Sequence, residues 1–183
     1  MEFEIVTTER LLLKKYTPEG LDYLFDTFSE TEIKQQLGLT TNEEFIKEKA
    51  KCKGGYKTYD RSIVHFKLIL KETNEVIGGG GFHNWYFDHY KAELGYALTK
   101  DAYKRKGYMS EAISVILDYG FNHMQLNRVE ACIWPENIAS LGLIRKYGFI
   151  QEGYLRKHYV RDGEIQDTLI FSLLKDEYEA NLK

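Results

Sequence analysis

The sequence has few of the residues that build disulfide, metal or membrane structures. Its two cysteines, Cys52 and Cys132, lie far apart among 183 residues, so we expect neither a disulfide framework nor a zinc site, and a reducing compartment fits. No run approaches the roughly 18 apolar residues of a membrane helix, and the acidic N-terminus does not resemble a secretory signal. With 25 basic and 28 acidic residues, the net charge of -3 argues against nucleic-acid binding through counterion release. These absences predict a cytoplasmic protein that binds neither membrane nor nucleic acid.

The order of hydrophobic patterns predicts one α/β domain over residues 1–183, built around a mixed sheet. Only 2 prolines and 43% hydrophobic residues favour a folded chain over a disordered one. The expected strands cover residues 11–16, 62–70, 76–82, 91–99, 128–134, 149–159 and 164–174. The expected helices begin at Thr17 or cover residues 41–51, 108–122 and 135–146.

Four consecutive glycines, residues 78–81, lie inside one expected strand. Glycine weakens a strand, so the run predicts a close backbone approach, a bulge, or both. It lacks the GxGxxG spacing and a following helix, which excludes a dinucleotide-binding loop. An aromatic turn over residues 85–90 is expected to lead to the next strand.

A basic segment precedes the helix with the clearest apolar face. Gly107 lets the backbone turn sharply, and Lys104, Arg105 and Lys106 lie beside the N–H groups of the helix start. Such a junction is suited to a diphosphate. A solvated basic loop ended by a glycine explains the same residues equally well.

A second segment, residues 137–149, contains a helix with Asn137 as N-cap and Gly148 as C-cap. Taken alone, it predicts only a well-terminated helix. It becomes informative about function only together with the basic segment, from which one helix and one strand separate it.

Five segments agree, in sequence and in order, with one known family. They are TERLLL (8–13), AELGY (92–96), KRKGYM (104–109), NIASLGLIRKYGF (137–149) and EGYLR (152–156). Together they resemble the GCN5-related N-acetyltransferases (GNAT), and particularly their RimJ/RimL-like branch. The resemblance covers nearly the whole chain. It implies a mostly antiparallel seven-stranded sheet, splayed in a V between its fourth and fifth strands and flanked by about four helices.

In this family acetyl-CoA lies in the V, and the resemblance implies which residues bind it as a cosubstrate. The backbone of Tyr96, Ala97 and Leu98 would bind the pantetheine arm like an added strand. Asn137 would hydrogen-bond the pantetheine region, and Ser140 would face the thioester sulfur. The pyrophosphate would bind the amides of Lys104, Arg105, Lys106, Gly107, Tyr108, Met109 and Ser110.

Three positions depart from the family pattern. Lys104 replaces Gln or Arg but keeps the charge, and Met109 replaces a small residue whose space its side chain can narrow. Ile144 occupies the position at which many relatives carry the tyrosine that protonates the leaving thiolate. The branch resemblance therefore puts forward Ser140 as the proton donor.

The attacking amine needs a base or a water relay, because only its neutral form attacks a carbonyl. The first candidate is Glu93, which matches a glutamate common in the branch, although a strand carboxylate paired with a cation is an equal alternative. The second candidate is His158, on a later strand. Asp167 matches an acidic residue of the branch without an assignable role.

The acceptor cleft is the least determined part. Aromatic residues are candidates for its walls, namely Trp85, Tyr86, Phe87, Tyr90 and Tyr159. A cationic acceptor would favour carboxylates there, and the candidates are Asp88, Glu93, Asp162 and Glu164.

The resemblance implies acetyl transfer to a primary amine by direct attack in a ternary complex. The branch favours a protein N-terminal α-amine, for example of a ribosomal protein, and the alternative is a small amine such as a polyamine, an aminoglycoside or an amino acid. A non-catalytic acyl-CoA sensor is a further alternative, which Ile144 supports and Glu93 and Ser140 oppose. A homodimer is compatible with the sequence, and no metal is expected.

Overall fold

The computed structural model describes residues 2–56, 58, 61–161 and 163–182. Eight strands form one sheet in the order β1-β2-β3-β4-β5-β6-β8-β7. The strands are β1 (Ile5–Thr7), β2 (Leu11–Tyr16), β3 (Arg61–Leu70), β4 (Glu75–Tyr86), β5 (Lys91–Leu98), β6 (Arg128–Ile133), β7 (Ile150–Arg161) and β8 (Glu164–Leu174). The α-helices are α1 (Pro18–Thr27), α2 (Glu30–Leu37), α3 (Asn42–Gly54), α4 (Tyr108–Asp118), α5 (Ile138–Lys146) and α6 (Lys175–Asn181).

The predicted α/β class is confirmed, and the predicted counts are too low. The structure adds the three-residue strand β1 and the short helices α2 and α6. β4 is also longer than expected, because the strand continues to Tyr86 and the turn is a 3₁₀ helix over Phe87–His89. The expected fourth and fifth strands are therefore β5 and β6.

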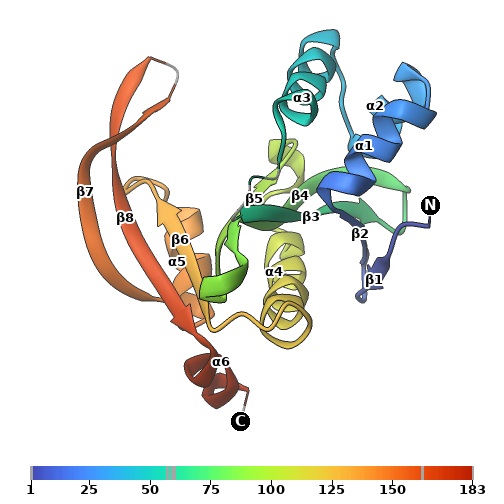
Figure 1. Cartoon of the computed structure of the whole chain (residues 1–183). Coiled ribbons are helices and arrows are strands. Elements are labelled where there is room, and N and C mark those ends of the chain that lie inside the picture. Colours follow the sequence, from blue (N-terminus) through green and yellow to red (C-terminus); the bar gives the residue numbers. More distant parts are fainter. Residues whose placement is uncertain (1, 57, 59–60, 162, 183) are drawn as a thin grey trace.

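Two apolar cores lie on opposite faces of the sheet. Along β3 the even-numbered residues, such as Phe66 and Leu68, are fully buried and belong to the same core as Ile113 and Ile116 of α4. A smaller core joins Tyr16 with α1, α2 and α3 on the other face. Figure 1 shows α1, α2 and α3 on one side of the first strands and α4 on the other. The odd-numbered residues of β3 consequently face α3.

The glycine run makes the close approach and the bulge that the sequence predicts. Gly81 has φ +156°, and a Cβ there would overlap the carbonyl of Val64 on β3. The β3–β4 register shifts between Ser62 and Val64. A Cβ on Gly79 would lie 2.5 Å from the His65 Nε2 atom. The run thus keeps side chains off the face of β4 that looks toward α3.

The sheet opens between its two parallel strands. β5 pairs with β4 from Leu98 back to Lys91, but with β6 only at Lys91, Ala92 and Glu93. Beyond Glu93 the two parallel strands separate, which confirms the predicted V-shaped splay.

Candidate active site

The N-terminus of α4 is open to a ligand. Gly107 is its N-cap, with φ +82°, a backbone conformation that favours glycine, and no side chain caps the helix. The first N–H groups of a helix have no partner within the helix. The N–H groups of Tyr108, Met109 and Ser110 therefore have no intrahelical partner, which is the arrangement that anions bind at helix starts.

A clamp from the N-terminal segment holds this helix start. Glu111 accepts hydrogen bonds from the Arg10 backbone N (2.8 Å) and the Arg10 Nε (2.7 Å), and from the Thr8 hydroxyl. Arg10 Nη1 donates to the Lys106 carbonyl at 2.9 Å, and its guanidinium lies 4.7 Å from the centre of the Tyr108 ring. The segment Thr8-Glu9-Arg10 thus fixes the basic loop, residues 104–106. The sequence analysis did not predict this role, because the contact between Arg10 and Glu111 joins residues 101 positions apart.

The structure adds one cation to those that the sequence names for this position. Lys104 pairs with Asp101 at 2.6 Å, at an exposed place. A cation of α5 also reaches the helix start, because Lys146 Nζ donates to the Ser110 hydroxyl at 2.6 Å. The Met109 side chain is 8% exposed and packs in the main core.

The separated edge of β5 offers backbone groups on one side. The Thr99 N–H donates to the Ile77 carbonyl of β4 at 2.9 Å. Because backbone groups alternate along a strand, Ala97 also faces β4, whereas Tyr96 and Leu98 direct N–H and C=O toward the edge that leaves β6. Two of the three residues named from the sequence therefore have the orientation that an added strand needs.

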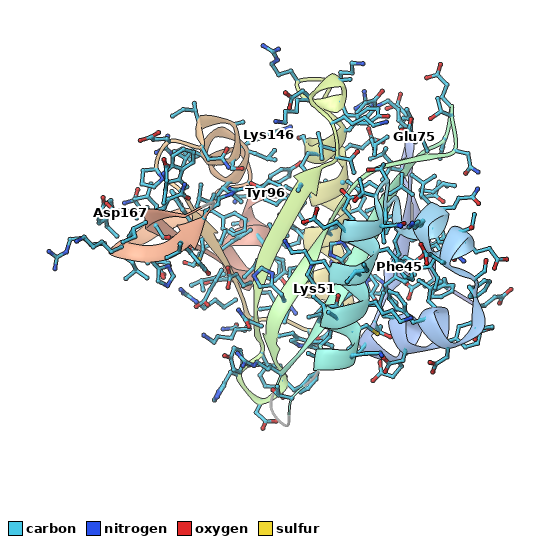
Figure 2. The ribbon with its side chains drawn as sticks, turned by 90° about the horizontal axis from the view of Figure 1, so that it is seen from above. Phe45, Lys51, Glu75, Tyr96, Lys146 and Asp167 are labelled. Atoms are coloured by element: carbon cyan, nitrogen blue, oxygen red, sulfur yellow. The ribbon has the colours of Figure 1, made fainter. Side chains whose placement is uncertain are left out.

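The side chains of Tyr96 and Ser140 lie close together at this edge. The Tyr96 hydroxyl is buried without a hydrogen-bond partner among the described residues, and Figure 2 places it on the side of β5 that faces the β7–β8 hairpin. Burial raises the pKa of Tyr96, and the nearby Ser140 hydroxyl opposes that rise. Asn137 caps α5, since its Oδ1 accepts from the Ser140 N–H at 3.1 Å. Ile144 is fully buried in the core.

Glu93 lies where β5 leaves β6 and is held by two side chains of β4. Its Oε1 is 3.2 Å from His83 Nε2, and its Oε2 accepts from Asn84 Nδ2 at 3.0 Å. Burial alone would raise the pKa of Glu93, but the hydrogen bonds from His83 and Asn84 and the adjacent Cys132 thiol lower it to about 2. Glu93 is therefore an ionised carboxylate that is held by neighbouring side chains. This arrangement resembles the alternative interpretation of Glu93, a strand carboxylate paired with a cation.

His83 is a candidate that the sequence did not reveal. Its ring lies over Gly95, where a Cβ would be 2.9 Å from His83 Cε1 and 3.1 Å from His83 Nδ1. His83 is linked to Glu93 by one ring nitrogen and also lines the cavity described below. His83 contributes to the lowered pKa of His65, and the Glu93 carboxylate contributes to the raised pKa values of Tyr159 and Cys132. Only the β4–β5 register brings His83 and Glu93 together.

The other candidates occupy different positions. His158 is exposed on β7, with its ring 4.4 Å from that of Tyr159. Asp167 accepts hydrogen bonds from the Tyr154 hydroxyl and, at 2.7 Å, from the Lys157 N–H, so it supports the irregular β7–β8 pairing. Burial, and secondarily the Glu93 carboxylate, raise the pKa of Cys132 to about 12, so its thiol stays protonated. Asp162, named above for the acceptor cleft, lies outside the described residues.

A cavity of about 570 Å³ lies between α3 and the glycine-rich face of β3, β4 and β5. It extends from Tyr16 and Leu37 to the separated edge of β5 at residues 95–99. The described residues contain no cluster of three His, Cys, Asp or Glu side chains that could hold a metal ion. In the same part of the chain, no helix is long and apolar enough to cross a membrane.

Comparisons with known proteins agree with this geometry. Residues 10–150 match the family model of the acetyltransferase (GNAT) domain. The uncharacterized N-acetyltransferase p20 of Bacillus licheniformis is 35% identical over 176 residues, which cover 96% of this chain and 98% of that protein. The [ribosomal protein uS5]-alanine N-acetyltransferase of Escherichia coli is 28% identical over 118 residues, or 64% of this chain and 60% of that one.

Solved structures share the fold. A dodecameric structure of spermidine N-acetyltransferase from Vibrio cholerae aligns with a TM-score of 0.70 over 96% of this chain and all of that one, at 18% identity. That identity supports the fold alone. With a family model that spans most of the chain and a relative that is similar over nearly all of it, this chain belongs to the GNAT family and is an N-acetyltransferase.

Proposed function

We propose that this chain transfers the acetyl group of acetyl-CoA to a primary amine by direct attack in a ternary complex. The observation that carries the proposal is the separation of β5 from β6 after Glu93, with the Tyr96–Ser140 pair on one face and the His83–Glu93 pair at the same point of the strand. The opening joins the α4–α5 face to the cavity face. We further propose that residues 1–183 act as one catalytic domain, because one continuous sheet carries every part of the site.

Several features fit acetyl-CoA on the α4–α5 face. The uncapped start of α4 and Lys146 suit a pyrophosphate, and the β5 edge at Tyr96 and Leu98 suits an extended amide-bearing arm. The buried Tyr96 hydroxyl lacks a partner among the described residues, which is unfavourable unless a bound group supplies one. Asn137 retains its amide N–H groups for the same arm, since only its oxygen caps α5.

The leaving thiolate needs a proton donor, because Ile144 supplies none. Ser140 begins α5 beside Tyr96, and either hydroxyl can donate to the sulfur. A thiol with a pKa near 8.5 is a good leaving group, so one hydroxyl hydrogen bond is adequate help. We assign this role first to Ser140, with Tyr96 as its buried neighbour.

The base is better assigned to His83 than to Glu93. The pKa of Glu93 is lowered, so its carboxylate is a weak proton acceptor for an α-ammonium. An imidazole is the commonest general base in proteins, and the His83 ring lines the cavity. Glu93 accepts from His83 Nε2–H and so leaves Nδ1 as the proton acceptor. The amine nitrogen then bonds to the acetyl carbon, the C–S bond breaks, and the amine proton passes to Nδ1.

The acceptor proposed first is a protein N-terminal α-amine. The E. coli relative acts on an alanine of ribosomal protein uS5, and it is similar over 64% of this chain. A polyamine is the less suitable alternative, because two lysines, Lys51 and Lys67, line the cavity. An α-amine also has a lower pKa than a lysine-like amine, so more of it is neutral at pH 7.

The test is thiol release from acetyl-CoA against short peptides with free N-termini, polyamines, aminoglycosides and amino acids. We expect release that requires the amine and is greatest with an α-amine. Release with polyamines alone would refute the assigned acceptor. Acetyl-CoA binding without release for any amine would favour a non-catalytic acyl-CoA sensor.

A further inference from the structure

The cavity beside α3 carries an excess of positive charge. Lys67 lies on β3 and Lys51 on α3, and Glu48 of α3 is the only carboxylate among the described lining residues. Glu48 is already engaged, since it accepts from the Tyr56 hydroxyl at 2.6 Å and from Lys51 Nζ at 3.0 Å. One ammonium, that of Lys67, is left without a counterion in contact.

The Lys67 ammonium has no hydrogen bond or ion pair to any described residue. Burial is the main influence on the pKa of Lys67 and lowers it, whereas Glu48 and the more distant Glu44 act on it only through space. Glu44 itself caps α3 by accepting from the Thr41 N–H at 3.1 Å, so it does not reach into the cavity. A partly buried ammonium without a partner is costly, which makes it unusual unless a ligand completes it.

Lys67 lines the cavity together with the glycines of β4. Gly79 pairs with Lys67 in the β3–β4 register, and the His65 ring lies over Gly79, with Nε2 2.5 Å from the position that a Cβ would take. Burial lowers the pKa of His65 to about 4, so at neutral pH its ring is an uncharged hydrogen-bonding group. The same cavity reaches His83 and Gly95 at the point of acetyl transfer. The ammonium and the reacting position therefore share one chamber.

We propose that Lys67 binds a carboxylate of the acceptor, so that the acceptor of this N-acetyltransferase is an amine that carries a nearby carboxylate. The inference rests on the proposed function and adds the charge of the substrate to it. The carboxylate has two sources, either the α-carboxylate of a free amino acid or an acidic side chain close to a peptide N-terminus. A carboxylate in contact with a desolvated ammonium forms a charge-assisted hydrogen bond of the stronger class.

The first test needs no variant. Acetyl transfer is measured with matched acceptors, namely an amino acid and its amide, and tripeptides that differ only by Asp or Asn at the second position. We expect kcat/KM to be roughly tenfold or more higher for the member of a pair that carries the carboxylate. The pair that shows the difference identifies the source. Transfer at equal rates to both members of both pairs would overturn this inference and leave the proposed function intact, whereas no transfer to any amine would overturn the proposed function.

Variants then assign the effect to Lys67. Lys67→Met keeps an unbranched side chain that is one atom shorter and removes the charge, and we expect it to abolish the preference for the carboxylate. Glu48→Gln should increase the preference, because it removes the opposing charge but can still accept from Tyr56. Lys47→Met, at an exposed position of α3, is the matched control. A preference unchanged in both Lys67→Met and Glu48→Gln would refute the assignment.

Discussion

A single added methyl group tests the proton path. In Gly95→Ala the new Cβ would lie 2.9 Å from His83 Cε1 and 3.1 Å from His83 Nδ1, where ordinary contacts are about 3.5 Å or more. The ring must move by roughly half an ångström, which stretches its 3.2 Å contact with Glu93. Misplacement of a reacting group by about 1 Å can lower the rate by about 10²-fold. For about half that displacement we expect kcat/KM for the amine to fall by roughly tenfold at pH 7.

Stability should hardly change in this variant. Gly95 lies in β5 with an ordinary strand backbone, so alanine recovers roughly 0.5–1 kcal/mol of chain entropy, which offsets the displacement of a flexible side chain. Gly153→Ala is the matched control, because its Cβ would be 3.7 Å from Ile170 in β8 and would meet no crowding. Thermal unfolding and acetyl-CoA binding should be the same in both variants.

The pH profile shows whether the rate of Gly95→Ala falls because His83 is displaced. With His83 displaced, only amine that is already neutral reacts, so log kcat/KM should rise with pH at a slope of 1 until the α-amine titrates near pH 8. The unaltered protein should reach its plateau at lower pH. A Gly95→Ala protein that folds, binds acetyl-CoA and keeps both the rate and the plateau would show that His83 does not accept the proton.

Three further expectations follow from the geometry. Gly107→Trp should abolish acetyl-CoA binding in calorimetry, because φ is +82° and a Cβ there already lies 3.2 Å from Arg10 Nη2; undiminished binding would exclude this helix start as the pyrophosphate site. Ser140→Ala should lower kcat with little effect on the KM for acetyl-CoA, and an unchanged kcat across pH would remove it as the acid. Glu93 has a pKa of about 2 in the folded protein, below its usual 4.5, so its contribution to stability is complete above about pH 4.5 and is lost as the pH falls toward 2. Glu93→Gln should flatten that acid limb in denaturant unfolding at several pH values, and an unchanged limb would contradict the lowered pKa.

The local features of the site could be predicted from sequence because local chemistry creates them. The glycine before α4 and the Asn137 cap follow from motifs within a few residues of one another, whereas the parting strands were expected from the family resemblance alone. Helix α2 also had a local signal, a capping box between Ser29 and Glu32, but only two buried residues, Ile33 and Leu37, follow it. Weak periodicity in a short helix explains why it was missed.

The residues that complete the site could not be found in this way. Arg10 reaches Lys106 across 96 positions, and Lys146 reaches Ser110 across 36. The His83–Glu93 contact depends on a register that is irregular just beyond His83. A shift of one residue would turn the His83 side chain to the opposite face of the sheet. Sequence patterns of single elements contain no information on such pairings.

Strand alternation separates the parts of the site that can change from those that cannot. In β3 and β5 the even-numbered Phe66 and Leu94 are buried, so their replacement costs packing energy. The odd-numbered Lys67, Glu93 and Gly95 lie on the opposite face, and Lys67 and Gly95 line the cavity, so a substitution there changes charge or shape but leaves the main core intact. The relative named for a ribosomal alanine and the structural neighbour named for spermidine show that proteins of this fold differ in acceptor. The acceptor of this chain should therefore be inferred from the charges on the face of the sheet that carries the odd-numbered residues of β3 and β5. The most informative of these charges is the uncompensated ammonium of Lys67.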